Sequence, residues 1–123
     1  MINVKNGKRK NACFLYAIAA ALFPVPRSNH NPDRASNYED SIKQFKVKDS
    51  DLPMPVHRIP FFERANNITV NVYTYDKKTK LPLYKSNSNY EAQVNLFLYN
   101  GHYSTISSFQ RFIILLGGDH QFV

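Results

Sequence analysis

The chain contains a single cysteine, Cys13, and a histidine, His102, opens a strand-like segment far along the sequence. Cys13 lies at the start of an apolar, alanine-rich run, 12–22, that is typical of a buried helix. Free N–H groups and the dipole at a helix N-terminus favour the thiolate, the nucleophilic form of a cysteine. An imidazole beside it would complete a thiol–imidazole pair. The sequence therefore predicts nucleophilic catalysis by Cys13, provided that the fold brings the strand alongside the helix.

Both residues also have structural interpretations. A free cysteine is often a small residue of the core, and a histidine after the turn-like residues 99–101 can simply lie on the surface. The other histidines are weaker candidates because they lie in a polar loop, before a helix and in a glycine-rich tail: His30, His57 and His120. Their spacing relative to Cys13 matches no zinc site, so we expect neither a metal nor a cofactor.

Length and composition limit the classes of protein that fit. At 123 residues the chain is expected to form one domain, 1–123, with its own core. One cysteine excludes a disulfide framework and fits a reducing, intracellular compartment, the cytoplasm or nucleus. No apolar run reaches the roughly 18 residues of a membrane span. The run 12–22 also lacks a small-residue cleavage site of a signal peptide. We expect a monomer that is not attached to a membrane.

The formal net charge of +7 raises the question of nucleic-acid binding. The basic residues, however, are spread over several segments and match no nucleic-acid-binding motif. Their main groups lie at 5–10, 43–48 and 77–80. The last group falls in a predicted hairpin turn, where solvated lysines are usual. We therefore do not expect nucleic-acid binding, and an acidic protein partner fits the charge at least as well.

The periodicity of apolar residues predicts helices at 12–22, 36–45 and 56–66. Asn11 is the expected N-cap of the first helix, which places Cys13 in its first turn. Ser36 and Glu39 match a capping box at the start of the second helix, and its apolar face would be formed by Tyr38, Ile42 and Phe45. Pro60 suits the first turn of the third helix.

Strands are predicted where apolar and polar residues alternate or form short runs: 2–4, 68–75, 83–84, 94–98 and 102–106. For 109–116 the pattern does not distinguish helix from strand. Helices come first and strands follow, joined by connections of hairpin length. This order predicts an α+β fold in which the N-terminal helix packs on a mainly antiparallel sheet.

Several motifs occur in the order found in a known family. They include NVKN at 3–6, CFLYAIAAALFP at 13–24, IPFFE at 59–63, NNITVNVY at 66–73, PLY at 82–84, VNL at 94–96 and HY at 102–103. Up to about Phe112 the chain resembles a module found beside protein-primed DNA polymerases in Maverick/Polinton-like transposons of invertebrates. That module resembles in turn the herpesviral tegument-type deubiquitinases. The resemblance implies a papain-like cysteine protease that hydrolyses isopeptide bonds after the C-terminal glycine of ubiquitin or polyubiquitin.

The same resemblance assigns Cys13 as the nucleophile and His102 as the general base. Tegument-type enzymes place the residue that orients the histidine two positions before it, normally an aspartate. Here that residue is Asn100, whose amide oxygen can accept a hydrogen bond from the ring. The alternatives are the serines at positions where transposon relatives often carry Asp or Asn, and a distant aspartate: Ser107, Ser108 and Asp119.

Acyl transfer also needs an oxyanion hole and a substrate groove. The backbone N–H of Cys13 and an amide side chain, Asn11 or Asn6, are candidate donors. Either asparagine can instead only cap the helix or turn the chain. The ubiquitin tail is basic and ends in glycines, so its groove must be narrow and partly acidic. The acidic residues that could supply this character are Asp51, Glu63 and Asp76. We expect Glu63 and Tyr103 to line the groove, unless they are a surface carboxylate and a core aromatic.

Two other functions stay open. The chain could be an adenain-like maturation protease that cuts proteins encoded by the same transposon. Alternatively, it could be a non-catalytic module that tethers the transposon polymerase to DNA or to a protein.

Overall fold

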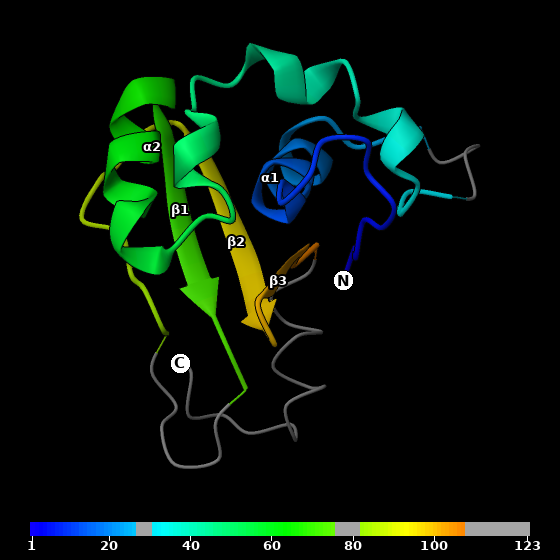
Figure 1. The fold of residues 1–123 in the computed structure, drawn as a ribbon. Coiled ribbons are helices and arrows are strands. Elements are labelled where there is room, and N and C mark those ends of the chain that lie inside the picture. The colour runs from blue at the N-terminus through cyan, green and yellow to red at the C-terminus, as the bar shows by residue number, and fades with distance from the viewer. Residues whose placement is uncertain (27–30, 76–81, 108–123) are drawn as a thin grey trace.

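A computed structural model gives the fold and describes residues 1–26, 31–75 and 82–107. Within these ranges the chain forms two α-helices, α1 (Cys13–Leu22) and α2 (Ile59–Asn66), and three strands (Figure 1). The strands are β1 (Ile68–Tyr73), β2 (Ala92–Tyr99) and β3 (His102–Thr105). Four 3₁₀ helices lie between α1 and α2: η1 (Ala35–Asn37), η2 (Ser41–Gln44), η3 (Asp49–Asp51) and η4 (Val56–Arg58). The predicted α+β class is confirmed.

The sheet is mixed, with the order β1-β2-β3. β2 runs antiparallel to β3, but β1 and β2 are parallel. The chain returns along the free edge of β1, where Tyr84 pairs with Val72 in an antiparallel bridge, before it enters β2. The prediction of a mainly antiparallel sheet is therefore wrong for the β1–β2 pair. Apolar alternation identifies a strand and its buried face but not the direction of its partner.

The predicted strands at 68–75, 94–98 and 102–106 are confirmed, with small shifts at their ends. The segments 2–4 and 83–84 contribute single bridges rather than full strands. Ile2 pairs with Thr105 on the outer edge of β3, so the N-terminal segment lies beside the C-terminal strand. The predicted turn at 76–80 and the segment 109–116 lie outside the described residues.

α1 is apolar around its whole circumference and is buried from Phe14 to Ala20. Its end is set by Pro24, which cannot continue a helix, and the N–H of Phe23 closes the last turn on Ala19. Its N-cap is Ala12, whose side chain makes no capping hydrogen bond. The prediction that Asn11 caps the helix is therefore wrong by one position.

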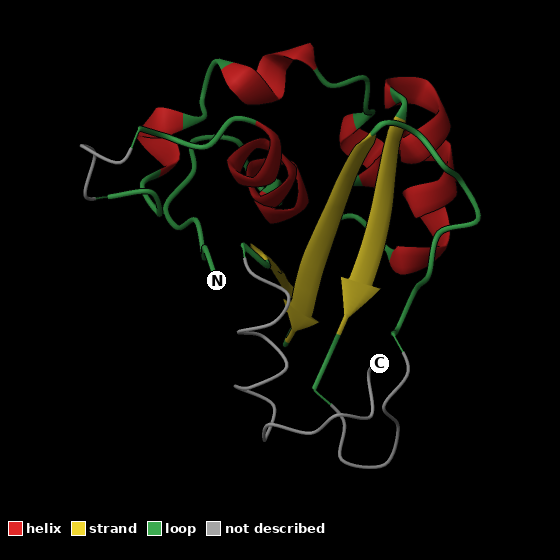
Figure 2. Ribbon diagram, turned by 180° about the vertical axis from the view of Figure 1, so that it is seen from behind, coloured by secondary structure: helices red, strands yellow, loops and turns green. Residues whose placement is uncertain are grey.

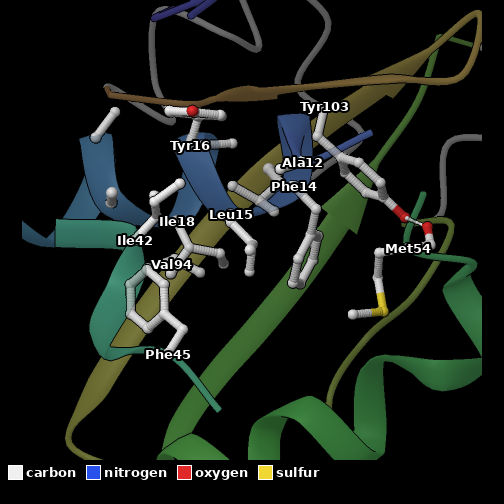
Figure 3. Close-up of a cluster of buried hydrophobic side chains, with 14 of the residues drawn as sticks. Ala12, Phe14, Leu15, Tyr16, Ile18, Ile42, Phe45, Met54, Val94 and Tyr103 are labelled. Atoms are coloured by element: carbon white, nitrogen blue, oxygen red, sulfur yellow. Dashed lines mark hydrogen bonds between the residues drawn. The ribbon is translucent and has the colours of Figure 1, made fainter. Parts of the chain in front are cut away.

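Both helices cover the same face of the sheet (Figures 1 and 2). Phe14 of α1 packs edge-to-face against Phe62 of α2, at 4.9 Å between ring centroids, and against Tyr103 of β3, at 5.0 Å. The Tyr103 hydroxyl donates a hydrogen bond of 2.8 Å to the backbone carbonyl of Met54 (Figure 3). These contacts join α1, α2 and β3 and fix the N-terminal end of α1, where Cys13 precedes Phe14.

The segment 36–45 forms 3₁₀ turns and not the predicted α-helix. Glu39, expected to form a capping box with Ser36, instead accepts hydrogen bonds from the Lys8 N–H at 3.1 Å and the Tyr16 hydroxyl at 2.5 Å. A contact with distant residues thus replaces the local cap. The apolar face predicted for the segment is nevertheless correct, since its members are all buried: Tyr38, Ile42 and Phe45.

Glu63 is buried, with 2% of its surface exposed, at the edge of β1 that faces away from β2. Its carboxylate accepts hydrogen bonds from the Val70 N–H at 2.9 Å and from three hydroxyl groups, those of Tyr84, Ser86 and Ser88. Burial raises the pKa of Glu63, but these hydrogen bonds outweigh that effect and lower the pKa below its ordinary value. Glu63 therefore joins α2 and the segment 84–88 to β1. The expectation that Glu63 lines a substrate groove is wrong, because no face of its carboxylate is open.

We expect Glu63→Gln to lower the free energy of unfolding by about 1–3 kcal/mol at neutral pH, because the amide NH₂ would face hydrogen-bond donors. The folded-state pKa of Glu63 is lowered, so the carboxylate contributes its full stability above about pH 4.3, the ordinary value for Glu. That contribution is lost as the pH falls through the lower folded-state value. Urea unfolding of wild type and variant over a pH series measures both effects.

Glu91→Gln is the matched control, because Glu91 is exposed. This variant should unfold like wild type at every pH. Equal stability of Glu63→Gln and wild type at neutral pH would contradict the structural role of the buried carboxylate.

Candidate active site

The N-terminus of α1 meets the β2–β3 hairpin. Cys13 Sγ lies 3.9 Å from the backbone oxygen of Gly101, to which the thiol donates. Asn100 and Gly101 form the two-residue turn, and their positive φ angles of 51° and 76° are those of a type I′ turn. His102 follows as the first residue of β3. The fold therefore brings the segments of the two predicted catalytic residues together, although 88 positions separate Cys13 from Gly101.

Cys13 is the first residue of α1 and is half-buried, not sealed in the core. The first hydrogen bond of the helix runs from the Tyr16 N–H to the Ala12 carbonyl. The N–H groups of residues 13–15 therefore have no acceptor within the helix. Unpaired N–H groups of this kind stabilise a negative charge at a helix N-terminus. The start of α1 therefore offers N–H donors to a negative charge.

The His102 ring is held by an amide from the N-terminal segment. Nε2 lies 2.5 Å from Oδ1 of Asn3. A carbonyl oxygen only accepts, so Nε2 donates and Nδ1 keeps its lone pair. Burial lowers the pKa of His102, and the positive charge of Lys5 lowers it further. Within the described part of the chain, Nδ1 makes no hydrogen bond and is available to accept a proton.

The thiol and the imidazole are not hydrogen-bonded to each other: the thiol contacts Gly101 and the ring contacts Asn3. The register of the hairpin explains the separation. Tyr103 pairs with Leu98 and faces α1, whereas His102 pairs with Tyr99 and points to the other face of the sheet. Catalytic hydrogen bonds are often long without substrate and tighten only in its presence.

Three other predicted site residues are exposed and lie in turns or loops near the start of α1 and the hairpin. Asn100 is exposed in the hairpin turn, and its side chain makes no hydrogen bond to His102. Asn6 and Asn11 are also exposed residues with positive φ, of 61° and 59°, and shape the loop that leads into α1. The alternatives Ser108 and Asp119 lie outside the described residues.

Tyr103 does not line an open groove. It is 2% exposed, and its hydroxyl is bonded to the backbone of Met54. Burial raises the pKa of Tyr103, and the charge of the neighbouring Cys13 raises it further. The expectation that Tyr103 contacts substrate is therefore wrong. Its role is to pack β3 against α1 beside the thiol.

Asn3 is the site residue that the sequence did not predict. It lies between Ile2 and Val4 in a segment that the alternation predicted as a strand. The backbone of Ile2 pairs with Thr105 through two hydrogen bonds of 2.8 Å, which places Asn3 beside β3 and within reach of His102. The only available signal was a polar residue in the middle of a strand. Its partner could not be read from the sequence.

In the part of the chain that the structure describes, no three His, Cys, Asp or Glu side chains gather to hold a metal ion. In the same ranges, no helix has the length and apolar character needed to cross a membrane. In comparisons with models of protein families, with curated proteins and with solved structures, the chain matches none.

The charge of Lys5 gives a test of the ring's environment. In Lys5→Gln we expect the pKa of His102 to rise, because a positive charge that opposes the imidazolium is removed. Proton NMR titration of the ring measures this pKa, with His102→Ala to assign the signal. Lys10→Gln, which removes an exposed charge from the same loop, should leave it unchanged. A pKa that is unchanged or lower in Lys5→Gln would contradict the geometry.

Proposed function

We propose that this protein is a papain-like cysteine hydrolase with Cys13 as the nucleophile and His102 as the general base. The observation that carries the proposal is the contact of Cys13 Sγ with the carbonyl of Gly101, at 3.9 Å, one residue before His102. The half-buried position at a helix N-terminus and the free Nδ1 of His102 support it. Asn3, rather than Asn100, is the amide that orients the ring.

In the proposed reaction, Nδ1 of His102 takes the proton of the Cys13 thiol. Sγ then attacks the scissile carbonyl carbon, and the N–H groups at the start of α1 stabilise the oxyanion. The tetrahedral intermediate collapses to a thioester, and the imidazolium gives its proton to the leaving amine. Water, deprotonated by the imidazole, attacks the thioester and releases the carboxylic acid and the thiol. Asn3 holds the ring in the tautomer that both halves of the cycle need.

The proposed substrate is ubiquitin or polyubiquitin, cleaved inside the cell after the C-terminal glycine by a monomeric enzyme. This choice rests on the resemblance to the tegument-type deubiquitinases through the transposon module. The isopeptide bond requires only the chemistry described above, since its leaving group is a lysine amine.

A second candidate is a maturation protease that cuts proteins encoded by the same transposon. The observation in its favour is the state of the acidic residues expected to receive the basic ubiquitin tail. Glu63 is buried, and Asp51 is paired with Arg58 at 3.3 Å. Neither carboxylate is free for such a tail.

Ubiquitin that carries a C-terminal electrophile tests the activity and the substrate together. Wild type should form a covalent adduct of increased mass, and Cys13→Ala should form none, because the chain has no other cysteine. Cleavage of a peptide library that requires Cys13, without any ubiquitin adduct, would favour the maturation protease. No adduct and no cleavage by folded wild type would refute the hydrolase and leave the non-catalytic module.

The two candidate amides can be separated by mutation. Asn3→Ala should slow adduct formation about tenfold or more, because the imidazole loses its fixed orientation. Asn100→Gly should react like wild type, because glycine accepts the positive φ of the turn. A slow Asn100→Gly beside a normal Asn3→Ala would reverse the assignment.

A further inference from the structure

A concave surface between α2 and the segment 46–48 takes no part in the proposed catalysis. Its volume is about 390 Å³. Its apolar lining consists of Val47, Met54, Phe62 and Ala65, and of these the buried Met54 and Phe62 form the floor. Its rim carries Lys46, Lys48, Arg58 and the ring of Phe61. We call this surface the basic pocket.

The two walls of the basic pocket are fixed to each other by Asn66, the last residue of α2. Asn66 Oδ1 accepts a hydrogen bond of 2.7 Å from the Lys46 N–H, and Asn66 Nδ2 donates one of 3.0 Å to the Lys46 carbonyl. The same amide donates to the carbonyl of Phe62 at 3.0 Å. The pocket is thus held open by the fold before any partner binds, which reduces the entropic cost of binding.

The free charge around the pocket is positive. Lys46 and Lys48 are exposed, and within the described residues neither ammonium group pairs with a carboxylate. The one acidic residue of the lining, Asp51, is paired with Arg58 at 3.3 Å. An acidic ligand therefore finds two unpaired cations above an apolar floor.

Phe61 helps to distinguish between the classes of acidic partner. Its side chain is 49% exposed, but the guanidinium groups of Arg58 and Arg64 lie over its ring, at 4.2 and 4.9 Å from the centroid. Binding of single-stranded nucleic acid relies on bases that stack on open aromatic faces, and here the protein's own cations occupy the ring. A recessed apolar floor with a polar rim is instead the arrangement that receives an anchoring side chain of a protein partner.

We propose that the basic pocket docks an acidic peptide segment of a partner protein. One large apolar side chain of the peptide enters the pocket, and flanking Asp or Glu residues pair with Lys46 and Lys48. This surface is separate from the thiol chemistry, so the proposal holds whether or not the protein is a hydrolase.

Fluorescence anisotropy with a labelled peptide mixture tests the proposal. Each peptide carries Leu, Ile, Met or Phe at its centre and Asp or Glu at the three positions on either side. The protein variants are Lys46→Glu/Lys48→Glu and the control Lys43→Glu/Lys85→Glu, which changes the net charge equally at exposed lysines outside the pocket. Binding to wild type and the control, with at least about tenfold weaker binding to the pocket variant, is expected.

A mixture with central Ala should also bind at least about tenfold more weakly to wild type, because it lacks the anchor. Three results would overturn the proposal. They are absence of binding to wild type, equal losses in the two charge variants, and tighter binding of a single-stranded oligonucleotide that depends on Lys46 and Lys48. Circular dichroism confirms that each variant is folded.

Discussion

The arrangement of the domain depends on the close packing of α1 against β3. Thr105 connects β3 to α1 and to the N-terminal segment. Its hydroxyl donates to the Ala17 carbonyl of α1 at 2.5 Å, and its backbone pairs with Ile2. The approach is possible because α1 presents alanines here, and a larger side chain would push the helix off the strand. One strand thereby aligns the N-terminal segment, the start of α1 and the hairpin. Asn3, Cys13 and His102 come from these three parts.

The contacts that the few carboxylates make within the protein determine the charge of its surface. The Glu63 carboxylate accepts a hydrogen bond from β1, and Glu39 accepts one from the Lys8 N–H in the loop before α1. Asp49 and Asp51 pair with arginines. The positive charges of the chain outnumber these groups, and among the described residues Lys46 and Lys48 pair with no carboxylate, so part of the net charge of +7 forms a local basic region. As a result, the free charge around the basic pocket is positive. These contacts also explain why the acidic groove expected for a ubiquitin tail is not formed by Glu63 or Asp51.

The sequence predicted the features that depend on local pattern. The helix at 12–22, the strands at 68–75, 94–98 and 102–106, and the apolar face of the segment 36–45 follow from the spacing of apolar residues. Pro60 lies in the first turn of α2 as expected. The sequence also predicted that the Cys13 and His102 segments meet. It failed where distant contacts decide the outcome. The parallel β1–β2 pairing is such a case, as is the 3₁₀ geometry that accompanies the contacts of Glu39.

The same limit applies to the site. Asn100 was an obvious candidate because it lies two residues from His102, but a type I′ turn needs residues that adopt positive φ, and Asn100 serves that need. Asn3 is 99 positions from His102, and only the pairing of Ile2 with Thr105 brings it close. Glu63 and Tyr103 have polar groups that bind buried partners, which a sequence cannot distinguish from groups that bind a substrate.

The central claim is that the imidazole of His102 activates the only thiol of the chain. The most direct test is the rate at which native protein reacts with iodoacetamide near pH 7, since this rate reports Cys13 alone. His102→Ala should react at least about tenfold more slowly than wild type, whereas His57→Ala, which removes an exposed histidine, should match wild type. Equal rates for folded wild type and His102→Ala would contradict the claim.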